Sequence, residues 1–485
     1  MKLSWPSLAE RLAFIEKREQ RPGPEVPSVL ALIPGAEALG SLRVTKSKVV
    51  AAPAESAPKP ICSAAWHSLW WLVSANSVGV MIAILLLFPA LNKGLGEWTY
   101  GRWIMVHMNL ELYGWTSLPM AGFLFRVYGA DREPFAQWCR PVLWVWSAAL
   151  VACSFSWLSG NSSGKLFLDF TGYARVVFPL AMVALWLLLA ISFVRGWSAN
   201  QTMASRAAKI LGLILLLVVP LLIYVAASPA IYPAVNPDTG GPTGASQLES
   251  SLVIVAILLL LPFGLTERKP GRTFWIGAAW VALLAESLLC AALGRADISH
   301  HQPAQYLSLA TLLIWIPLTP AYFAAFKWHA NTRLWAYAVF AWWSALIVTG
   351  WVLFLPGVLD HFKFTDGLVG HSFVAMAGFT SSLIVFIMVH LLGEDGWIFN
   401  RPRSFYLWNG SVAGYVVLMT IAGWHEGFNP AFTIVPGFAR NTLYVLRLLT
   451  GVLMLAASVD WLVDATRLLE DPLSLEAAQL EEKTA

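Results

Sequence analysis

The chain has 485 residues, of which 58% are hydrophobic and only 12% are charged, and its formal net charge is +4. A soluble domain is about one quarter charged, so this composition excludes a disordered protein, a nucleic-acid-binding protein and a cytosolic enzyme. The apolar residues occur in long blocks. The sequence therefore predicts an all-α polytopic membrane protein, with membrane lipid as its surroundings.

Residues 1–60 form a polar stretch that is rich in proline and alanine and holds nine basic residues. The longest apolar run in it, residues 29–34, is too short for the hydrophobic region of a secretory signal. We expect a cytoplasmic N-terminal extension here, which serves either as a plain tail or as a docking arm for a partner.

Twelve segments are apolar and long enough to cross a membrane as helices, which takes about 20 residues each. They cover residues 66–90, 103–128, 138–158, 174–195, 207–228, 248–265, 273–294, 304–326, 333–355, 367–392, 405–425 and 438–463. They predict a twelve-helix transmembrane domain over residues 61–466. Residues 467–485 contain five acidic residues, Glu470, Asp471, Glu476, Glu481 and Glu482, and we expect an acidic cytoplasmic tail there.

Lysine and arginine in short loops predict the orientation of the spans. The loops after even-numbered spans hold thirteen of these residues, and the loops after odd-numbered spans hold seven. We therefore expect a bacterial-type inner (plasma) membrane protein with both termini in the cytoplasm. The opposite face is called the outer face below.

Several common chemistries have no motif in this sequence. The four cysteines, Cys62, Cys139, Cys153 and Cys290, form no C-x-x-C pair and no C-x-x-C-H site. A disulfide framework and a covalently attached haem c are therefore not expected. The chain also has no Gly-rich phosphate loop and no H-E-x-x-H motif, so nothing favours nucleotide or hydrolase chemistry.

Histidines gather on the predicted outer face. The five at or near it are His107, His300, His301, His371 and His425. His107 and His371 each lie about 6 Å inside the start of their spans, the second and the tenth, at 1.5 Å per residue. Such a pair suits one bis-imidazole haem or two separate haems, with outer-face arginines such as Arg102 and Arg440 near the propionates. The alternative for each single histidine is an interfacial ring that snorkels to water.

Ionisable residues inside spans are costly and therefore indicate function. Glu111 lies one turn after His107 on the same helical face. Glu286 falls near the middle of the seventh span, and Glu249 opens the sixth. Each is a candidate to carry protons or orient a ligand, and the alternative is a neutral acid hydrogen-bonded between helices. Arg447 in the twelfth span is either a functional charge or the partner of a buried acid.

Four short motifs lie at the ends of the predicted spans. They are Tyr100-Gly101-Arg102 followed by His107-Met108-Asn109; Thr365-Asp366 through Gly370-His371 with Gly378-Phe379; Ala422-Gly423-x-x-Glu426-Gly427; and Tyr444-Val445-x-Arg447-x-x-x-Gly451. With the twelve-span layout, they resemble the haem-copper oxidase subunit I superfamily, and within it the cbb-type branch. The resemblance covers roughly residues 66–466 and is diverged.

The resemblance implies a twelve-helix fold, at least one haem b and a place in respiratory electron transfer. His107 would match the ligand of the low-spin haem, His371 the ligand of the high-spin haem, and Arg102 a propionate-side arginine. His300 and His301 would match the adjacent pair of copper ligands. The implied partners are other respiratory-complex subunits, among them a cytochrome c or cupredoxin-type subunit, and no nucleic acid.

The sequence departs from the family pattern at the metal sites. The second low-spin ligand is expected two residues beyond His371, where Phe373 stands, and residues 241–249 lack the expected copper histidine. The seventh span also lacks the expected tyrosine, so copper or non-haem iron is doubtful. Because residues two apart on a helix point about 200° apart, His371 cannot replace Phe373 without rotation of the helix. Three outcomes remain: a haem on His371 alone, a haem that bridges His107 and either His371 or His425, or no haem.

These observations leave three hypotheses of function. The first is a haem-binding membrane subunit in respiratory electron transfer, whose catalytic version would reduce oxygen or nitric oxide. The second is a non-catalytic scaffold or accessory subunit that has lost its cofactors. The third is a transporter, which twelve spans also suit, although the two halves of the chain show no repeat.

Overall fold

The computed structural model describes residues 58–163, 165, 167–197, 202–233, 247–293 and 302–470. All of them belong to one compact unit that runs from Glu55 to Ala485. The predicted N-terminal extension up to residue 57, residues 241–246, the His300–His301 pair and the tail after Glu470 lie outside the described residues. Within the described part, the chain is helical, and no strand occurs apart from one isolated bridge between Arg268 and Phe326.

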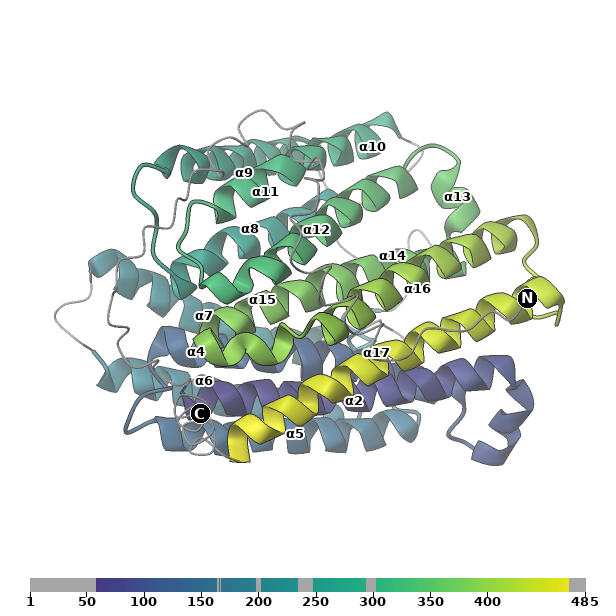
Figure 1. The fold of residues 1–485 in the computed structure, drawn as a ribbon, viewed down its shortest axis with the longest axis horizontal. Helices are drawn as coiled ribbons and strands as arrows, with labels where there is room; N and C mark the ends of the chain where they lie inside the picture. The colour runs from purple at the N-terminus through teal and green to yellow at the C-terminus, as the bar shows by residue number, and fades with distance from the viewer. Residues whose placement is uncertain are drawn as a thin grey trace, which may run out of the picture. The chain divides into compact units, whose positions relative to one another are not determined.

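The helices follow one another along the chain with short connections (Figure 1). They are α2 (Lys59–Leu87), η3 (Pro89–Leu95), α3 (Tyr100–Asn109), η4 (Leu110–Thr116), α4 (Ser117–Tyr128), α5 (Ala136–Leu158), α6 (Ala174–Arg195), α7 (Met203–Ala226), α8 (Gln247–Leu265), α9 (Thr273–Leu293), α10 (Pro303–Ala310), η5 (Thr311–Ile314), α11 (Trp315–Phe323), η6 (Ala330–Thr332), α12 (Arg333–Leu353), α13 (Val358–Phe362), α14 (Asp366–Phe373), η7 (Val374–Thr380), α15 (Ser381–Leu392), η8 (Gly393–Phe399), α16 (Pro402–Phe428) and α17 (Phe438–Glu470). Two of the short segments, η4 and η7, are π-helical.

The described part of the chain contains eleven helices that are long and apolar enough to cross a membrane. This confirms the prediction of an all-α polytopic membrane protein. The second predicted span, residues 103–128, is not among the eleven, although the chain is helical without a break from Tyr100 to Tyr128. The structure therefore has one candidate span fewer than the predicted twelve. Polar residues, among them His107, Asn109 and Glu111, lower the mean hydropathy of residues 103–128.

The helices begin and end close to the predicted positions. The sixth span, predicted at residues 248–265, matches α8, and the fourth matches α6. The first helix begins at Lys59 instead of residue 66, with Pro60 in its first turn, where the missing N–H of proline costs no hydrogen bond. Hydropathy locates the apolar middle of a helix, whereas the polar turns at its ends depend on capping and on neighbouring loops.

Helix α2 lies at the centre of the packing. It packs along α17 and also against α3, η4, α4 and α5, while α17 packs in turn against α16 (Figure 1). One cluster of buried apolar residues joins α2 to the helices from α8 onward, and a second joins it to the helices from α3 to α7. Helix α2 therefore connects the first third of the described chain to the rest.

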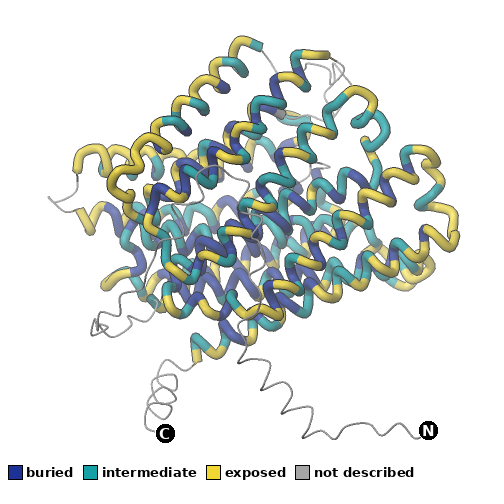
Figure 2. The backbone as a smooth tube through the Cα atoms, turned by 45° about the horizontal axis from the view of Figure 1, so that its top comes forward, coloured by how far each residue is buried: buried dark blue, intermediate teal, exposed yellow. Residues whose placement is uncertain are grey.

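Large apolar side chains cover the outward faces of several helices. In Figure 2 the buried residues lie where helices face one another, and the exposed residues lie on the outer sides. On α7 the exposed apolar residues include Leu211, Ile214, Leu215, Leu221 and Leu222. In water such a surface would be costly, but lipid tails are as apolar as these side chains. The faces suit a lipid bilayer.

The loops after the sixth, eighth and tenth predicted spans meet at one end of the helices. Lys327 N donates to Glu267 O at 2.9 Å, and Asn331 Nδ2 donates to Gly393 O at 3.2 Å. Lys327 Nζ also donates to Glu267 Oε2 at 2.9 Å, and this contact holds the pKa of that exposed carboxyl below its usual value. Loops that follow even-numbered spans therefore share one end, as alternating crossings require.

The loops after odd-numbered spans meet at the other end. Arg440 Nη2, in the first turn of α17, donates to Leu86 O at the end of α2 at 2.8 Å. Arg102 Nη1, at the start of α3, donates to Leu158 O at the end of α5 at 2.7 Å. Helices α3, α14 and α17 begin at this end, and the candidate site lies just inside it.

Candidate functional site

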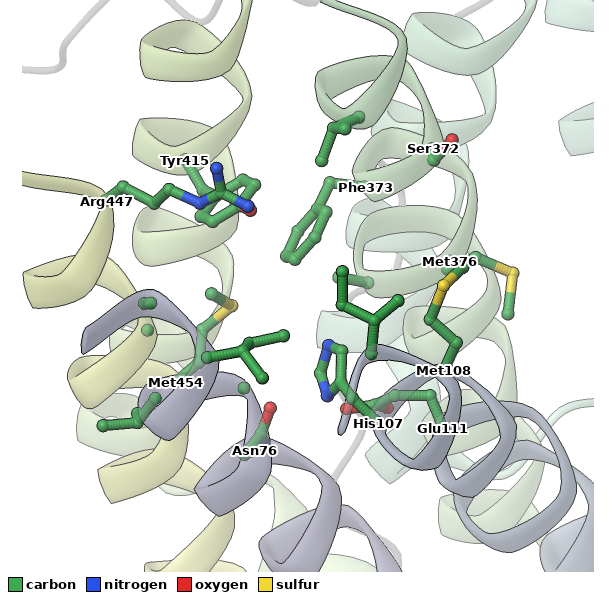
Figure 3. Close-up of a pocket in the computed structure, with 18 of the residues that line it drawn as sticks. Asn76, His107, Met108, Glu111, Ser372, Phe373, Met376, Tyr415, Arg447 and Met454 are labelled. Carbon is green, nitrogen blue, oxygen red and sulfur yellow. The ribbon is translucent and has the colours of Figure 1, made fainter. Parts of the chain in front are cut away.

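A cavity of about 420 Å³ lies between α2, the α3–η4 helix, the α14–η7 helix, α16 and α17 (Figure 3). This volume falls in the range of about 300–1,000 Å³ that is usual for ligand and cofactor sites. Most of its lining is apolar. The polar lining residues are Asn76, Tyr100, His107, Glu111, Thr116, Ser372, Tyr415 and Arg447. A largely apolar cavity with a few polar groups is the arrangement typical of a binding site inside a membrane protein.

The imidazole of His107 lines the cavity in a defined tautomer. Its Nδ1 lies 2.8 Å from the carbonyl oxygen of Ala75 on α2. Because a carbonyl oxygen only accepts, Nδ1 must carry the proton, and Nε2 then has a free lone pair. No described residue forms a hydrogen bond with Nε2. A histidine that binds a metal through one nitrogen commonly donates from the other to a carbonyl in this way.

Gly79 lets α2 approach this ring closely. A Cβ atom at position 79 would lie 3.0 Å from His107 Cε1. That is shorter than an ordinary van der Waals contact, so any larger residue would displace the ring. Ala75 and Gly79, one turn apart on α2, thus together fix the position of the imidazole: Ala75 by its hydrogen bond and Gly79 by its close contact.

Glu111 faces the same cavity from η4. It follows His107 by four residues, as the sequence predicted, and both side chains come from one helix in Figure 3. Within the described part of the chain, its carboxyl group has no hydrogen-bond partner. A carboxyl group in an apolar cavity needs a donor, so Glu111 is available to the occupant of the site.

Phe373 lines the cavity from α14. Its ring stacks on the ring of Tyr415 with centroids 3.8 Å apart and planes 18° apart. The residue two positions beyond His371 therefore does face the cavity of His107, as the family pattern implies for a second ligand. It offers an apolar ring there and no atom that binds iron.

His371 does not line this cavity and faces α12 instead. Its Nδ1 lies 3.0 Å from Thr349 Oγ1, whose hydroxyl donates to Ala345 O at 2.7 Å. The hydroxyl must therefore accept from Nδ1–H, which leaves the Nε2 of His371 with a lone pair as well. A Cβ at Gly350 would lie 3.5 Å from the His371 ring. The structure thus does not bring His107 and His371 into one cavity, because residues 371 and 373 point to different sides of α14.

Arg447 stands at the polar end of the cavity. Its Nη1 lies 3.4 Å from Asp366 Oδ1, and Tyr444 donates its hydroxyl to Asp366 Oδ2 at 3.0 Å. The Asp366 backbone N–H donates to Glu426 Oε2 at 2.5 Å. Of the two predicted alternatives for Arg447, the pairing with a buried acid is present, and its side chain also lines the cavity.

The predicted arginines lie elsewhere. Arg102 donates to Leu158 O and pairs with Glu97 at 3.2 Å, and Arg440 donates to Leu86 O. Neither lines the cavity. Both instead join loops at the end where α3 and α17 begin. The cation that lines the cavity is Arg447, which lies about two turns further along α17 than Arg440.

His425 and the two other predicted acids also lie outside the cavity. His425 is exposed and stacks on Phe432 with centroids 5.1 Å apart. Glu286 is buried on α9, where its Oε2 accepts from Trp315 Nε1 at 2.6 Å and its Oε1 has no partner among the described residues. Glu249 is exposed in the first turn of α8.

A loop residue that the sequence did not indicate also lines the cavity. Phe167, between α5 and α6, has a φ of 62° and reaches the cavity. Its carbonyl accepts from the Tyr113 hydroxyl at 2.6 Å, and Asn109 Nδ2 donates to Asp169 Oδ2 at 3.3 Å in the same loop. The only sequence signal was Asn109 in the His107-Met108-Asn109 motif, whose amide holds this loop over the site.

No group of three or more histidine, cysteine, aspartate or glutamate residues that would hold a metal ion occurs among the described residues, a set that leaves out His300 and His301. Comparison with protein-family models gives no match, and comparison with curated proteins gives none either.

Proposed function

We propose that this protein is a haem-binding integral membrane subunit that takes part in respiratory electron transfer. Its b-type haem would lie in the cavity, with His107 as the axial ligand. The observation that supports this most directly is the orientation of His107, whose Nδ1 is fixed by Ala75 O while Nε2 faces the cavity without a partner. The resemblance to the haem-copper oxidase subunit I superfamily supports the same assignment.

The rest of the lining fits such a group. Apolar side chains from five helices exclude water, which the flat macrocycle of a haem requires for tight binding. The guanidinium of Arg447 and the hydroxyl of Tyr100 provide donors for the propionates. When bound, the haem would supply one-electron redox chemistry. The protein's part is to hold the imidazole, neutralise the carboxylates and keep the site dry.

The proposal extends to the surroundings of the protein. We place it in a bacterial-type inner membrane with both termini in the cytoplasm, beside other respiratory-complex subunits. A cytochrome c or cupredoxin-type subunit on the outer side would exchange electrons with a haem near that face. A catalytic version, which reduces oxygen or nitric oxide, would need a second metal near His300 and His301.

The test compares two histidine variants of the purified full-length protein. We expect His107→Ala to lose the Soret band and the pyridine-haemochrome signal of the cavity haem. His371→Ala is the matched control, because it removes an imidazole from the facing helix outside the cavity, and it should keep that haem. Size-exclusion chromatography establishes that both variants are folded. Wild-type protein without haem from cells supplied with haem precursor would overturn the proposal, as would an unchanged haem content in His107→Ala.

A second candidate function is a scaffold subunit without cofactors. The stack of Phe373 on Tyr415, where the family pattern implies an imidazole, favours it. It predicts a parent complex whose spectrum and activity are unchanged by His107→Ala. A loss of either in that variant would exclude the scaffold.

A further inference from the structure

Helix α14 forms one wall of the cavity, opposite the helix that carries His107. The side chains on this wall decide whether a haem in the cavity would receive a second axial ligand from the protein. We infer that His107 is the only axial ligand that the protein supplies, and that the second axial position faces Phe373 and is open to a small neutral diatomic gas. This inference rests on the proposed haem at His107. It changes the role of the site from electron transfer alone to the binding of an exchangeable ligand.

Phe373 cannot move aside to admit another protein ligand from α14. Its ring is held against Tyr415 at 3.8 Å. A Cβ at Gly370, one turn earlier, would lie 3.3 Å from Val416 O on α16, so the backbones of the two helices are already in close contact. Side chains on the cavity face of α14 are therefore fixed by packing.

His371 cannot take the place of Phe373. To face His107 it would need α14 to rotate by about 200°. The backbone of Gly367 on α14 touches Gly423 on α16 so closely that no side chain fits between them. Asp366, which begins α14, is tied to Arg447 and Tyr444. These contacts oppose the rotation, and His371 keeps its hydrogen bond to Thr349.

The other lining residues that carry a possible ligand atom are Tyr100 and Glu111, which come from the same helix as His107, Tyr415, whose ring stacks on Phe373, and three thioethers. The three methionines that line the cavity are Met108, Met376 and Met454. Met108 follows His107 directly and points about 100° away from it on the same helix, so it cannot lie opposite to it across an iron atom. In Figure 3 the Phe373 ring lies above the His107 ring, with Met108 and Met376 to one side and Met454 to the other. In this view none of the three labelled thioethers lies above the His107 ring, where the apolar ring of Phe373 lies.

An iron with one imidazole and an apolar surface on its other side binds small neutral ligands. Carbon monoxide donates an electron pair from carbon to ferrous iron, and one iron–carbon bond forms while none breaks and no electron is transferred. The Phe373 ring itself offers neither a hydrogen-bond donor nor a charge to hold an anion, and the guanidinium of Arg447 in the same cavity is paired with Asp366. The axial ligand and the polarity of the distal side are what decide ligand binding at a haem.

The experiment titrates carbon monoxide into the dithionite-reduced, purified full-length protein and follows the Soret band. We expect one carbon monoxide per His107 haem, and a high-spin signal in the ferric state. Phe373→His, which places an imidazole at the position facing His107, should give a low-spin haem and abolish carbon monoxide binding. Phe373→Leu is the matched control, because it keeps an apolar side chain and should still bind the gas.

Further variants distinguish the outcomes. His371→Ala should leave the carbon monoxide response unchanged, and loss of the response there would overturn the inference by moving the gas site away from His107. A wild-type haem that is low-spin and does not bind carbon monoxide would also overturn it. Gain of binding in Met376→Leu or Met454→Leu would then identify the thioether as the ligand. Absence of any haemochrome would remove the proposed function itself, and the spectrum separates that result from all the others.

Discussion

At the residue scale, the site depends on how one imidazole is fixed. The carbonyl oxygen of Ala75 accepts a hydrogen bond from His107 Nδ1–H, and Gly79 leaves room for the ring on the same face of α2. A partner on the non-ligating nitrogen fixes the orientation of a ligand histidine and raises its basicity. The chemistry of His107 is therefore decided by two residues of another helix.

The variant Gly79→Ala tests the close contact between α2 and the His107 ring. The new Cβ would lie 3.0 Å from His107 Cε1 and push the ring by a few tenths of an ångström. Loss of a group that orients a metal ligand typically weakens binding by about 10–100-fold, and for the proposed haem we expect at least the lower figure, measured as faster haem transfer to apomyoglobin. Gly277→Ala on α9, where nothing lies within 4 Å, should leave the rate at the wild-type value. Equal rates in the two variants would contradict the role of Gly79.

At the element scale, the cavity lies where two helices depart from regular α geometry. The π-helical segment η4 begins three residues after His107, and η7 follows Phe373 directly. Both contribute lining residues, Glu111 from η4 and Met376 from η7. Single π-helical turns often mark functional sites, because the additional residue in the turn changes the direction of the side chains. The two segments border the cavity from two different helices.

The contact of α14 with α16 is the second element-scale feature, and Gly423→Ala tests it. A Cβ at position 423 runs into the backbone of Gly367, so one helix must move. Overpacking of this kind typically costs about 1–3 kcal/mol, and we expect a lower thermal midpoint and a smaller yield of monodisperse protein. Gly410→Ala lies on the same helix with nothing within 4 Å and serves as the control. Equal thermal midpoints of the two variants would show that α14 and α16 are not in close contact at this point.

At the scale of the whole molecule, the loops divide between two ends. Loops after odd-numbered predicted spans meet near Arg440 and Leu86, and loops after even-numbered spans meet near Glu267 and Lys327. The second group carries thirteen basic residues in the sequence and the first carries seven. Because short basic loops tend to remain in the cytoplasm, we predict that the end near Lys327 lies on that side.

Reporter fusions check this orientation. Green fluorescent protein folds in the cytoplasm and not after export through the general secretory route, so a fusion to the C-terminus should be fluorescent. A fusion of alkaline phosphatase at the same position should be inactive, whereas a phosphatase fused after Trp98, in the first outer loop, should be active. Reversed activities at the two positions would place both termini on the outer side.

The sequence by itself determined the spans, because crossing a membrane demands local runs of apolar residues that can be read along the chain. It also placed His107 and Glu111 on one helical face through their four-residue spacing, and the family resemblance implied that position 373 belongs to the same site. Only the tertiary structure decided that His371 faces α12, that Arg447 lines the cavity in place of Arg102 and Arg440, and that Phe167 reaches it from a loop. Hydropathy is a property of single segments, whereas the lining of a cavity depends on how each helix is rotated and which neighbours it contacts.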